Sequence, residues 1–227
     1  NSGLDRQSFN LTGTFEPVKR LAIDARANYI IEKAKNRPML SDGAGSANYN
    51  AVFLPTSLDI RDLKPWKTDK GAEIPYNTGN TWDTNPWFAA YEIQNNTDRN
   101  RLISSISARY TFDNGLFIQG RAGQDFYTNS YLSVLPPGLA YVPPNNLVSQ
   151  KMRFSDINAD VLVGKSFKVN DDISLTPNVG ASYRNTKTDL TINQGSGVLV
   201  PGVYNIAGLK NKSVAYAETE QETQSVY

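Results

Sequence analysis

The side chains able to do chemistry in this chain are arginines, aspartates and aromatic rings, because the sequence contains no histidine and no cysteine. A Ser-His-Asp triad or a histidine-bearing metal site therefore cannot be completed within it. Val163-Gly164-Lys165-Ser166 matches the end of a phosphate-binding loop, but that loop requires glycine where Ala159 stands. Asp171-Asp172 is more typical of a turn than of a cation site. We expect no enzyme activity, no metal site and no cofactor.

A set of charged residues recurs at alternate positions of several segments: Arg26, Arg109, Arg121, Asp125, Asp160 and Arg184. Alternate residues of a strand point to the same face of a sheet. In a wide barrel that face borders water or a domain that plugs the barrel. The simpler interpretation of the set is a lumen wall that makes ion pairs with such a plug. A path for the substrate is the alternative.

The segment from Lys33 to Asp98 is a second candidate, because it holds all three tryptophans of the chain. Its candidates for a ligand or partner site are Trp66, Trp82, Trp87 and Tyr91. Exposed aromatic rings stack on sugars or anchor protein interfaces, whereas compact loops also bury such rings within themselves. We expect Trp82, Trp87 and Tyr91 to fix the loop near Asn85-Pro86, and Trp66 to meet a partner or ligand.

The elements that carry these residues are predicted to be β-strands, because apolar and polar residues alternate with a period of two. From Leu21 to Tyr29 the odd positions are apolar, and Asp24 and Arg26 lie between them. The predicted strands are 9–15, 21–29, 102–112, 116–126, 157–167, 173–183 and a weaker one from about residue 213. Short turns at 16–19, 113–115 and 170–172 alternate with long loops at about 33–98, 131–153 and 191–209. This sorting is typical of outer-membrane barrels, whose short turns are periplasmic and whose long loops are extracellular.

Aromatic residues on the apolar face form two rows. Phe15, Phe112 and Phe167 come just before the short turns, and Tyr29, Phe126 and Tyr183 come about ten residues after them. Ten residues at about 3.3 Å each and a tilt near 45° rise about 23 Å. A transmembrane barrel has aromatic girdles at both edges of an apolar band about 25 Å tall. The residues predicted to face lipid are Leu21, Ile23, Ile118, Val161, Val163, Leu175 and Val179.

These patterns predict an all-β fold, in which residues 1–227 form about seven strands of one transmembrane antiparallel up-and-down β-barrel domain. The formal charge of +1 gives no electrostatic case for nucleic acid. A soluble β-sandwich is the alternative, although strands of about 12 residues exceed the usual 5–6 or so. The chain begins without Met or a signal segment, so we expect it to be a section of a longer protein.

Three motifs carry a family resemblance. Asn85-Pro86-Trp87-Phe88-Ala89-Ala90-Tyr91 is followed by Thr97-Asp98-Arg99-Asn100-Arg101, and then by Gly120-Arg121-Ala122-Gly123-Gln124-Asp125-Phe126-Tyr127 after a short turn. In this order they resemble the barrel domain of SusC/RagA-type TonB-dependent transporters of Bacteroidetes. The resemblance implies a barrel of about 22 strands, a size class whose lumen is plugged. It also implies that the plug domain and the TonB-contacting segment lie outside this chain.

The resemblance further implies TonB-dependent import of an oligosaccharide or oligopeptide across the bacterial outer membrane. The implied partners are a SusD-like surface lipoprotein that acts as a lid, TonB, outer-membrane lipid and the substrate, with no nucleic acid. This chain would contribute barrel wall and extracellular loops. A passive porin or structural outer-membrane barrel is the alternative with the same fold, and a soluble sugar-binding β-sandwich is the alternative with another fold.

Overall fold

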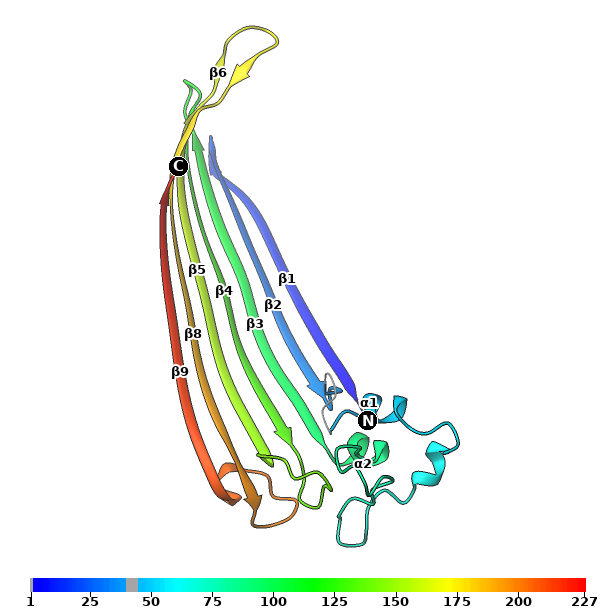
Figure 1. Ribbon diagram of the computed structural model, residues 1–227. Helices are drawn as coiled ribbons and strands as arrows, with labels where there is room; N and C mark the ends of the chain where they lie inside the picture. Colours follow the sequence, from blue (N-terminus) through cyan, green and yellow to red (C-terminus); the bar gives the residue numbers. More distant parts are fainter. Residues whose placement is uncertain (1, 40–44) are drawn as a thin grey trace.

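The computed structural model describes residues 2–39 and 45–227, and in this part of the chain seven long strands form one antiparallel sheet (Figure 1). The order is β1-β2-β3-β4-β5-β8-β9, so each long strand pairs with the next along the chain. Their bounds are β1 (Gly3–Val18), β2 (Leu21–Lys35), β3 (Gln94–Thr111), β4 (Leu116–Val134), β5 (Leu147–Lys165), β8 (Asn178–Val198) and β9 (Leu209–Val226). Apart from a small β6–β7 hairpin, the described residues contain no other sheet. The up-and-down prediction is confirmed, and the β-sandwich alternative is wrong.

The strands are longer than the alternation predicts. They run from 15 residues in β2 to 21 in β8, whereas about 9–11 residues suffice to cross a bilayer. Past the row of Tyr29, Phe126 and Tyr183, the sheet face that carries the apolar residues becomes polar. Lys33 paired with Asp98 is an example, and the backbone pairing of the two strands continues there. The period-two signal therefore ends before the strand does. The loops expected at about 33–98, 131–153 and 191–209 occupy only 36–93, 135–146 and 199–208.

Short turns and long loops lie at opposite ends of the sheet (Figure 1). The β3–β4 turn needs Gly115, whose φ of 79° is in the left-handed region. The β1–β2 turn is equally tight, with Val18 paired to Leu21 and Arg20 at a φ of 79°. Asp113 in the β3–β4 turn forms an ion pair with Arg20 in the β1–β2 turn, so the two turns are linked.

The third short connection differs from the expected strand 173–183. β6 (Phe167–Lys168) and β7 (Ser174–Leu175) form a separate hairpin that bends away from the end of the sheet (Figure 1). Asn170 makes the expected turn, since its Oδ1 accepts hydrogen bonds from the backbone N–H groups of Asp172 and Ile173 at 3.0 and 2.8 Å. Pro177 has no N–H to donate to the ladder, and β8 begins directly after it at Asn178. Leu175 and Phe167 thus lie on the hairpin and outside the main sheet.

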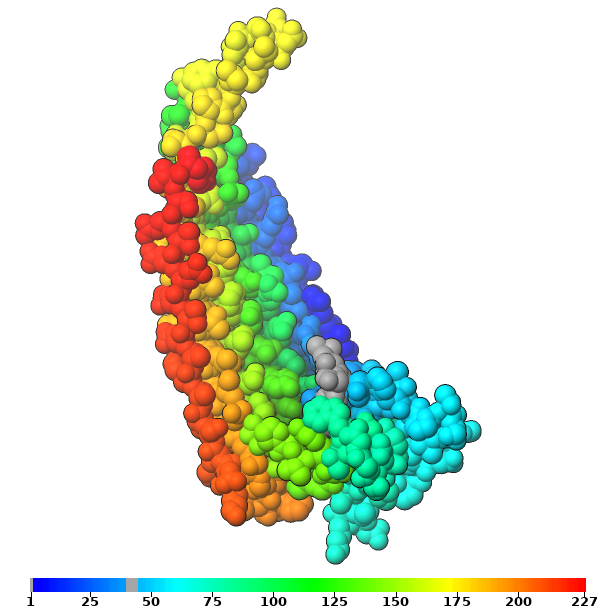
Figure 2. All heavy atoms as spheres, in the orientation of Figure 1, coloured from blue at the N-terminus to red at the C-terminus, as the bar shows by residue number. Residues whose placement is uncertain are grey.

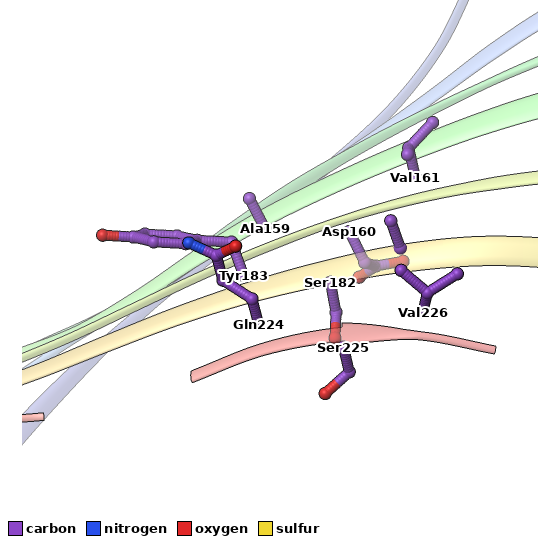
Figure 3. A pocket seen from close by; sticks show the side chains of 9 residues that line it. Ala159, Asp160, Val161, Ser182, Tyr183, Gln224, Ser225 and Val226 are labelled. Carbon is purple, nitrogen blue, oxygen red and sulfur yellow. The ribbon is translucent and has the colours of Figure 1, made fainter. Parts of the chain in front are cut away.

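The sheet has one apolar and one polar face. Ile118, Val163 and Val179 lie opposite one another on β4, β5 and β8, so all three point to the same face. Figure 3 shows this alternation at the β9 edge, where Val161 and Val226 lie on one side of the ribbons and Ser225 on the other. Ile118, Val161 and Val179 are 43–58% exposed, so this apolar face is not covered within the sheet.

The aromatic row nearer the loops runs diagonally across the sheet. Residues directly opposite one another form a rung, and Tyr29, Leu102 and Phe126 share one. That rung reaches β8 at Lys187, whereas Tyr183 lies four residues closer to the short turns. Four residues over the four strand spacings from β2 to β8 correspond to a strand tilt of about 35°, using about 3.3 Å per residue and about 4.8 Å per strand.

The row nearer the short turns falls in the same direction. The rung of Phe15 reaches β3 at Ala108, and Phe112 lies four residues beyond it, directly after the end of β3. The tilt of about 35° obtained from Tyr29 and Tyr183 agrees with the 35–45° or so of outer-membrane barrel strands. The two ends of the row nearer the loops, Tyr29 and Tyr183, are therefore level if the strands are tilted as they are in a bilayer.

Helices are confined to the loops. They are α1 (Ala47–Val52), η1 (Ile60–Leu63), α2 (Pro86–Tyr91) and η2 (Ile206–Gly208). In the described ranges, none of these helices has the length and apolarity to cross a membrane. Figure 2 shows the β2–β3 loop as a lobe that projects from the end of the sheet. At the same end, Val134, Leu147 and Leu209 form a buried cluster that joins the β4–β5 and β8–β9 connections.

Candidate functional site

The polar face carries charge-assisted pairs between neighbouring strands. Arg121 donates from Nε to both oxygens of Asp160, at 2.9 and 3.0 Å. The side chain of Arg184 makes a two-point contact with Asp156, at 2.9 Å from Nε and 2.6 Å from a terminal nitrogen. The structure therefore gives the predicted lumen residues Arg121 and Arg184 partners within the sheet itself.

A third pair joins Arg101 to Asp125, at 2.8 Å from Nε and 2.5 Å from a terminal nitrogen. Sequence reasoning named Asp125 and missed Arg101 and Asp156. Both lie in the polar phase of their strands, so the alternation itself held the signal. Because Arg101 sits opposite Tyr127 and reaches Asp125 diagonally, only the strand register identifies the partner.

The polar face is hollowed around the Arg121–Asp160 pair, which is part of the lining. A hollow of ≈ 580 Å³ is lined by residues of β2, β3, β4 and β5, including Asp24, Arg26, Ser105, Ser107, Gln119 and Asn158. Arg26 is exposed there. The guanidinium of Arg109 instead lies over the ring of Phe117, 3.8 Å from its centre. Hydroxyls, amides and charges thus line this face, which is the composition of a wall in contact with water or with polar protein.

The lobe between β2 and β3 has its own core, although residues 40–44 of this loop lie outside the described residues. Phe88, Ala89 and Ile93 are buried together with Leu139 of the β4–β5 loop. Asn85, which is 1% exposed, joins three segments. Its Oδ1 accepts from Trp87 N at 3.0 Å and caps α2, and its Nδ2 donates to the carbonyls of Leu63 and Ile74 at 3.1 and 3.0 Å.

Glu73 ties the lobe to the β4–β5 loop. Its carboxylate accepts from Asn85 N at 2.6 Å and from Ala140 N at 2.8 Å. Burial raises the pKa of Glu73 above its usual value, and the two backbone hydrogen bonds oppose that rise. A buried carboxylate that satisfies two backbone donors holds two loops together, and its removal would leave both donors unsatisfied.

Three of the candidate aromatic residues form one stack. The ring of Trp66 lies 5.1 Å from that of Tyr91 and 6.4 Å from that of Trp87, and the Lys64 ammonium lies 3.9 Å from the centre of the Trp87 ring. Trp66 Nε1 donates to Glu92 at 3.0 Å. Burial raises the pKa of Glu92, but hydrogen bonds from Lys67 and Trp66 outweigh it, so the net shift is downward.

Trp82 lies elsewhere, with its ring edge-on to Tyr141 of the β4–β5 loop at 4.7 Å. Trp66 therefore shares one stack with Trp87 and Tyr91 within the lobe, and its contact with a partner or ligand stays a prediction. Self-packing explains most of their surface, although Tyr91 remains 48% exposed. Sequence alone could not show this, because Trp66 and Tyr91 meet only through the fold of the intervening loop.

Comparisons with known proteins give a match to solved structures. No family model and no curated protein matches the chain. The RagAB peptide importer in its 'closed-closed' state aligns with a TM-score of 0.63 and 16% identity, over 96% of this chain and 25% of that one. The RagAB peptide transporter gives 0.61 and 17%, over 98% and 26%. The 'open-open' state of the importer gives 0.65 and 15%, over 99% and 25%.

This chain has the fold of a RagA barrel segment. The match to RagA extends over nearly all of the seven-stranded sheet and its loops, so the predicted fold is confirmed. The chain spans about a quarter of the length of the RagA chains that it matches. At 15–17% identity the likeness to RagA concerns the fold.

Proposed function

We propose that this chain is a section of barrel wall, with its extracellular loops, of a TonB-dependent transporter in a bacterial outer membrane. The observation that carries the proposal is the fold match to RagAB over 96–99% of the chain. The uncovered apolar face supports a lipid environment, as does the diagonal course of the two aromatic rows. The residues that we propose to face lipid in the main sheet are Leu21, Ile23, Ile118, Val161, Val163 and Val179.

The long loops face the cell exterior in this proposal, and the short turns face the periplasm. The lobe and the β4–β5 loop pack on each other through Glu73 and Leu139, which supports a preformed docking surface for a SusD-like lipoprotein. The plug and the contact with TonB belong to parts of the protein outside this chain. The proposed role is transport and not catalysis.

An oligopeptide is favoured over an oligosaccharide as the substrate, because the matched RagAB structures are described as a peptide importer or transporter. A passive porin is the competing function with the same fold. It would conduct solutes without TonB and without the proton gradient.

Uptake measurements test the proposal. A strain lacking the full-length gene should lose uptake of labelled oligopeptides, and the gene should restore it. Deleting TonB or collapsing the proton gradient should abolish uptake in the restored strain. Uptake that continues without TonB would identify a porin, and uptake restricted to oligosaccharides would correct the substrate.

A further inference from the structure

The polar face is not uniform in charge along its height. Toward the short turns, Arg121 and Arg184 are neutralised by carboxylates of this chain. Toward the loops, Arg99 lies on the same face, opposite Glu32 on one side and Asn129 on the other. The nearby Glu32 carboxylate is held by Arg37 at 3.2 Å. Within residues 2–39 and 45–227, Arg99 makes no ion pair, so its charge is left for another partner.

The contacts that Arg99 does make hold its guanidinium in place without neutralising it. Its Nε donates a long hydrogen bond to Asn129 Oδ1, at 3.4 Å. Its guanidinium lies 5.7 Å from the centre of the Tyr127 ring, a cation–π distance. The guanidinium group has five N–H donors in a planar fork, so most of them remain for an acceptor.

A pair of stacked rings lies beside this cation. Tyr127 and Phe154 stack across β4 and β5 with centres 4.8 Å apart and planes 20° from parallel. Tyr127 is fixed on two sides, because its hydroxyl donates to Met152 Sδ at 3.7 Å and Arg101 lies 6.0 Å from its ring. Both rings are half-buried, so part of their surface is open to the space in front of the polar face.

An unneutralised guanidinium beside open aromatic surface suits a carboxylate with an apolar group next to it, because guanidinium and carboxylate pair bidentately. We propose that Arg99, with the rings of Tyr127 and Phe154, forms a subsite that binds a carboxylate of the imported peptide. Every unmodified peptide has a C-terminal carboxylate, and Asp or Glu side chains add others. This inference rests on the proposed function. The position supports substrate over plug, because Arg99 is nearer the extracellular loops than Arg101, Arg121 and Arg184, whose ion pairs lie within the polar face.

The test uses the full-length transporter and one peptide in three forms: with a free C-terminus and internal Glu, with an amidated C-terminus, and with Glu replaced by Gln. Wild-type protein should bind the carboxylate-bearing form about tenfold tighter than at least one neutralised form, which corresponds to about 1.4 kcal/mol. The form that loses affinity shows which carboxylate is bound. R99Q should remove the preference and leave the affinity for the neutralised form unchanged.

Two further variants separate this subsite from general effects. R121Q is the matched control, because Arg121 lies about 26 Å along β4 from the rung of Arg99 and should leave the preference intact. Tyr127→Leu should weaken binding of all three peptides, whereas Tyr127→Phe should keep it, because the ring and not the hydroxyl faces the guanidinium.

Equal affinity of wild-type protein for all three peptides would overturn the subsite. So would an R99Q variant that kept the preference, or one whose only change was a lower unfolding temperature, the result expected of a plug contact. In these cases peptide uptake would continue and the proposed function would stand. A transporter that took up no peptide would contradict the proposed function, and the subsite with it.

Discussion

Asn85→Ala should unlock the β2–β3 lobe while leaving the sheet intact. The substitution removes a helix cap, worth about 1 kcal/mol, and two hydrogen bonds to backbone carbonyls, worth about 1 kcal/mol each. Because Asn85 is 1% exposed, water cannot replace these bonds without opening the lobe. The expected local destabilisation is about 3 kcal/mol, or about a hundredfold in the open population.

Hydrogen–deuterium exchange on the full-length protein measures the open population of the lobe directly. Amides between residues 63 and 93 should exchange about a hundredfold faster in Asn85→Ala, because exchange follows the open population. Asn85→Asp should recover only the cap, since a carboxylate accepts from Trp87 N but cannot donate to the carbonyls of Leu63 and Ile74. Asn48→Ala, an exposed change in the same loop, is the control.

If residues 63–93 exchanged at the wild-type rate in Asn85→Ala, the hydrogen bonds of Asn85 would not be what holds the lobe together. Faster exchange in β3 and β4 as well would refute the lobe as a separately opening unit.

Ile118→Arg should destabilise the folded protein by about 2–4 kcal/mol if it faces the middle of the bilayer, whereas Gln119→Arg, the next residue on the opposite face, should cost little; urea titration in lipid measures both. A tag inserted between Lys70 and Gly71 should be labelled on intact cells and one between Asp171 and Asp172 should not, and the reverse pattern would invert the topology. Burial raises the pKa of Glu73 above 4.5, so the native lobe binds that proton more tightly than the unfolded chain and loses stability as the pH rises from 4.5 through the raised pKa; exchange in Glu73→Gln should lack this dependence. Trp66→Ala should speed exchange of the lobe by removing the centre of the stack, and retention of a SusD-like partner in the same variant should fall if the stack also forms its docking surface.

The strands could be predicted from the sequence because the alternation of apolar and polar residues within one strand shows which residues lie on each of its two faces. The alternation of Leu21 to Tyr29 with Asp24 and Arg26 depends only on local period, and the structure has a strand there. The ends of the strands could not be predicted because the apolar–polar alternation stops before Lys33 and Asp98, although their backbones still pair.

The candidate site was harder to predict, because its contacts depend on register and loop folding. Arg101 meets Asp125 only because β3 and β4 are aligned by the Gly115 turn. The residues of the Trp66 stack are brought together by a loop whose helices are each a few residues long. Alternation identified which residues share a face, and could not identify which of them touch.

Site-directed spin labelling along β5 tests the central claim most directly. The chain has no native cysteine, so single cysteines from Asn158 to Val163 can be labelled in full-length protein reconstituted in lipid. We predict that labels at Ala159, Val161 and Val163 collide with oxygen dissolved in lipid, and that labels at Asn158, Asp160 and Leu162 collide with a water-soluble nickel reagent. Equal access of the nickel reagent to both sets would contradict the transmembrane barrel.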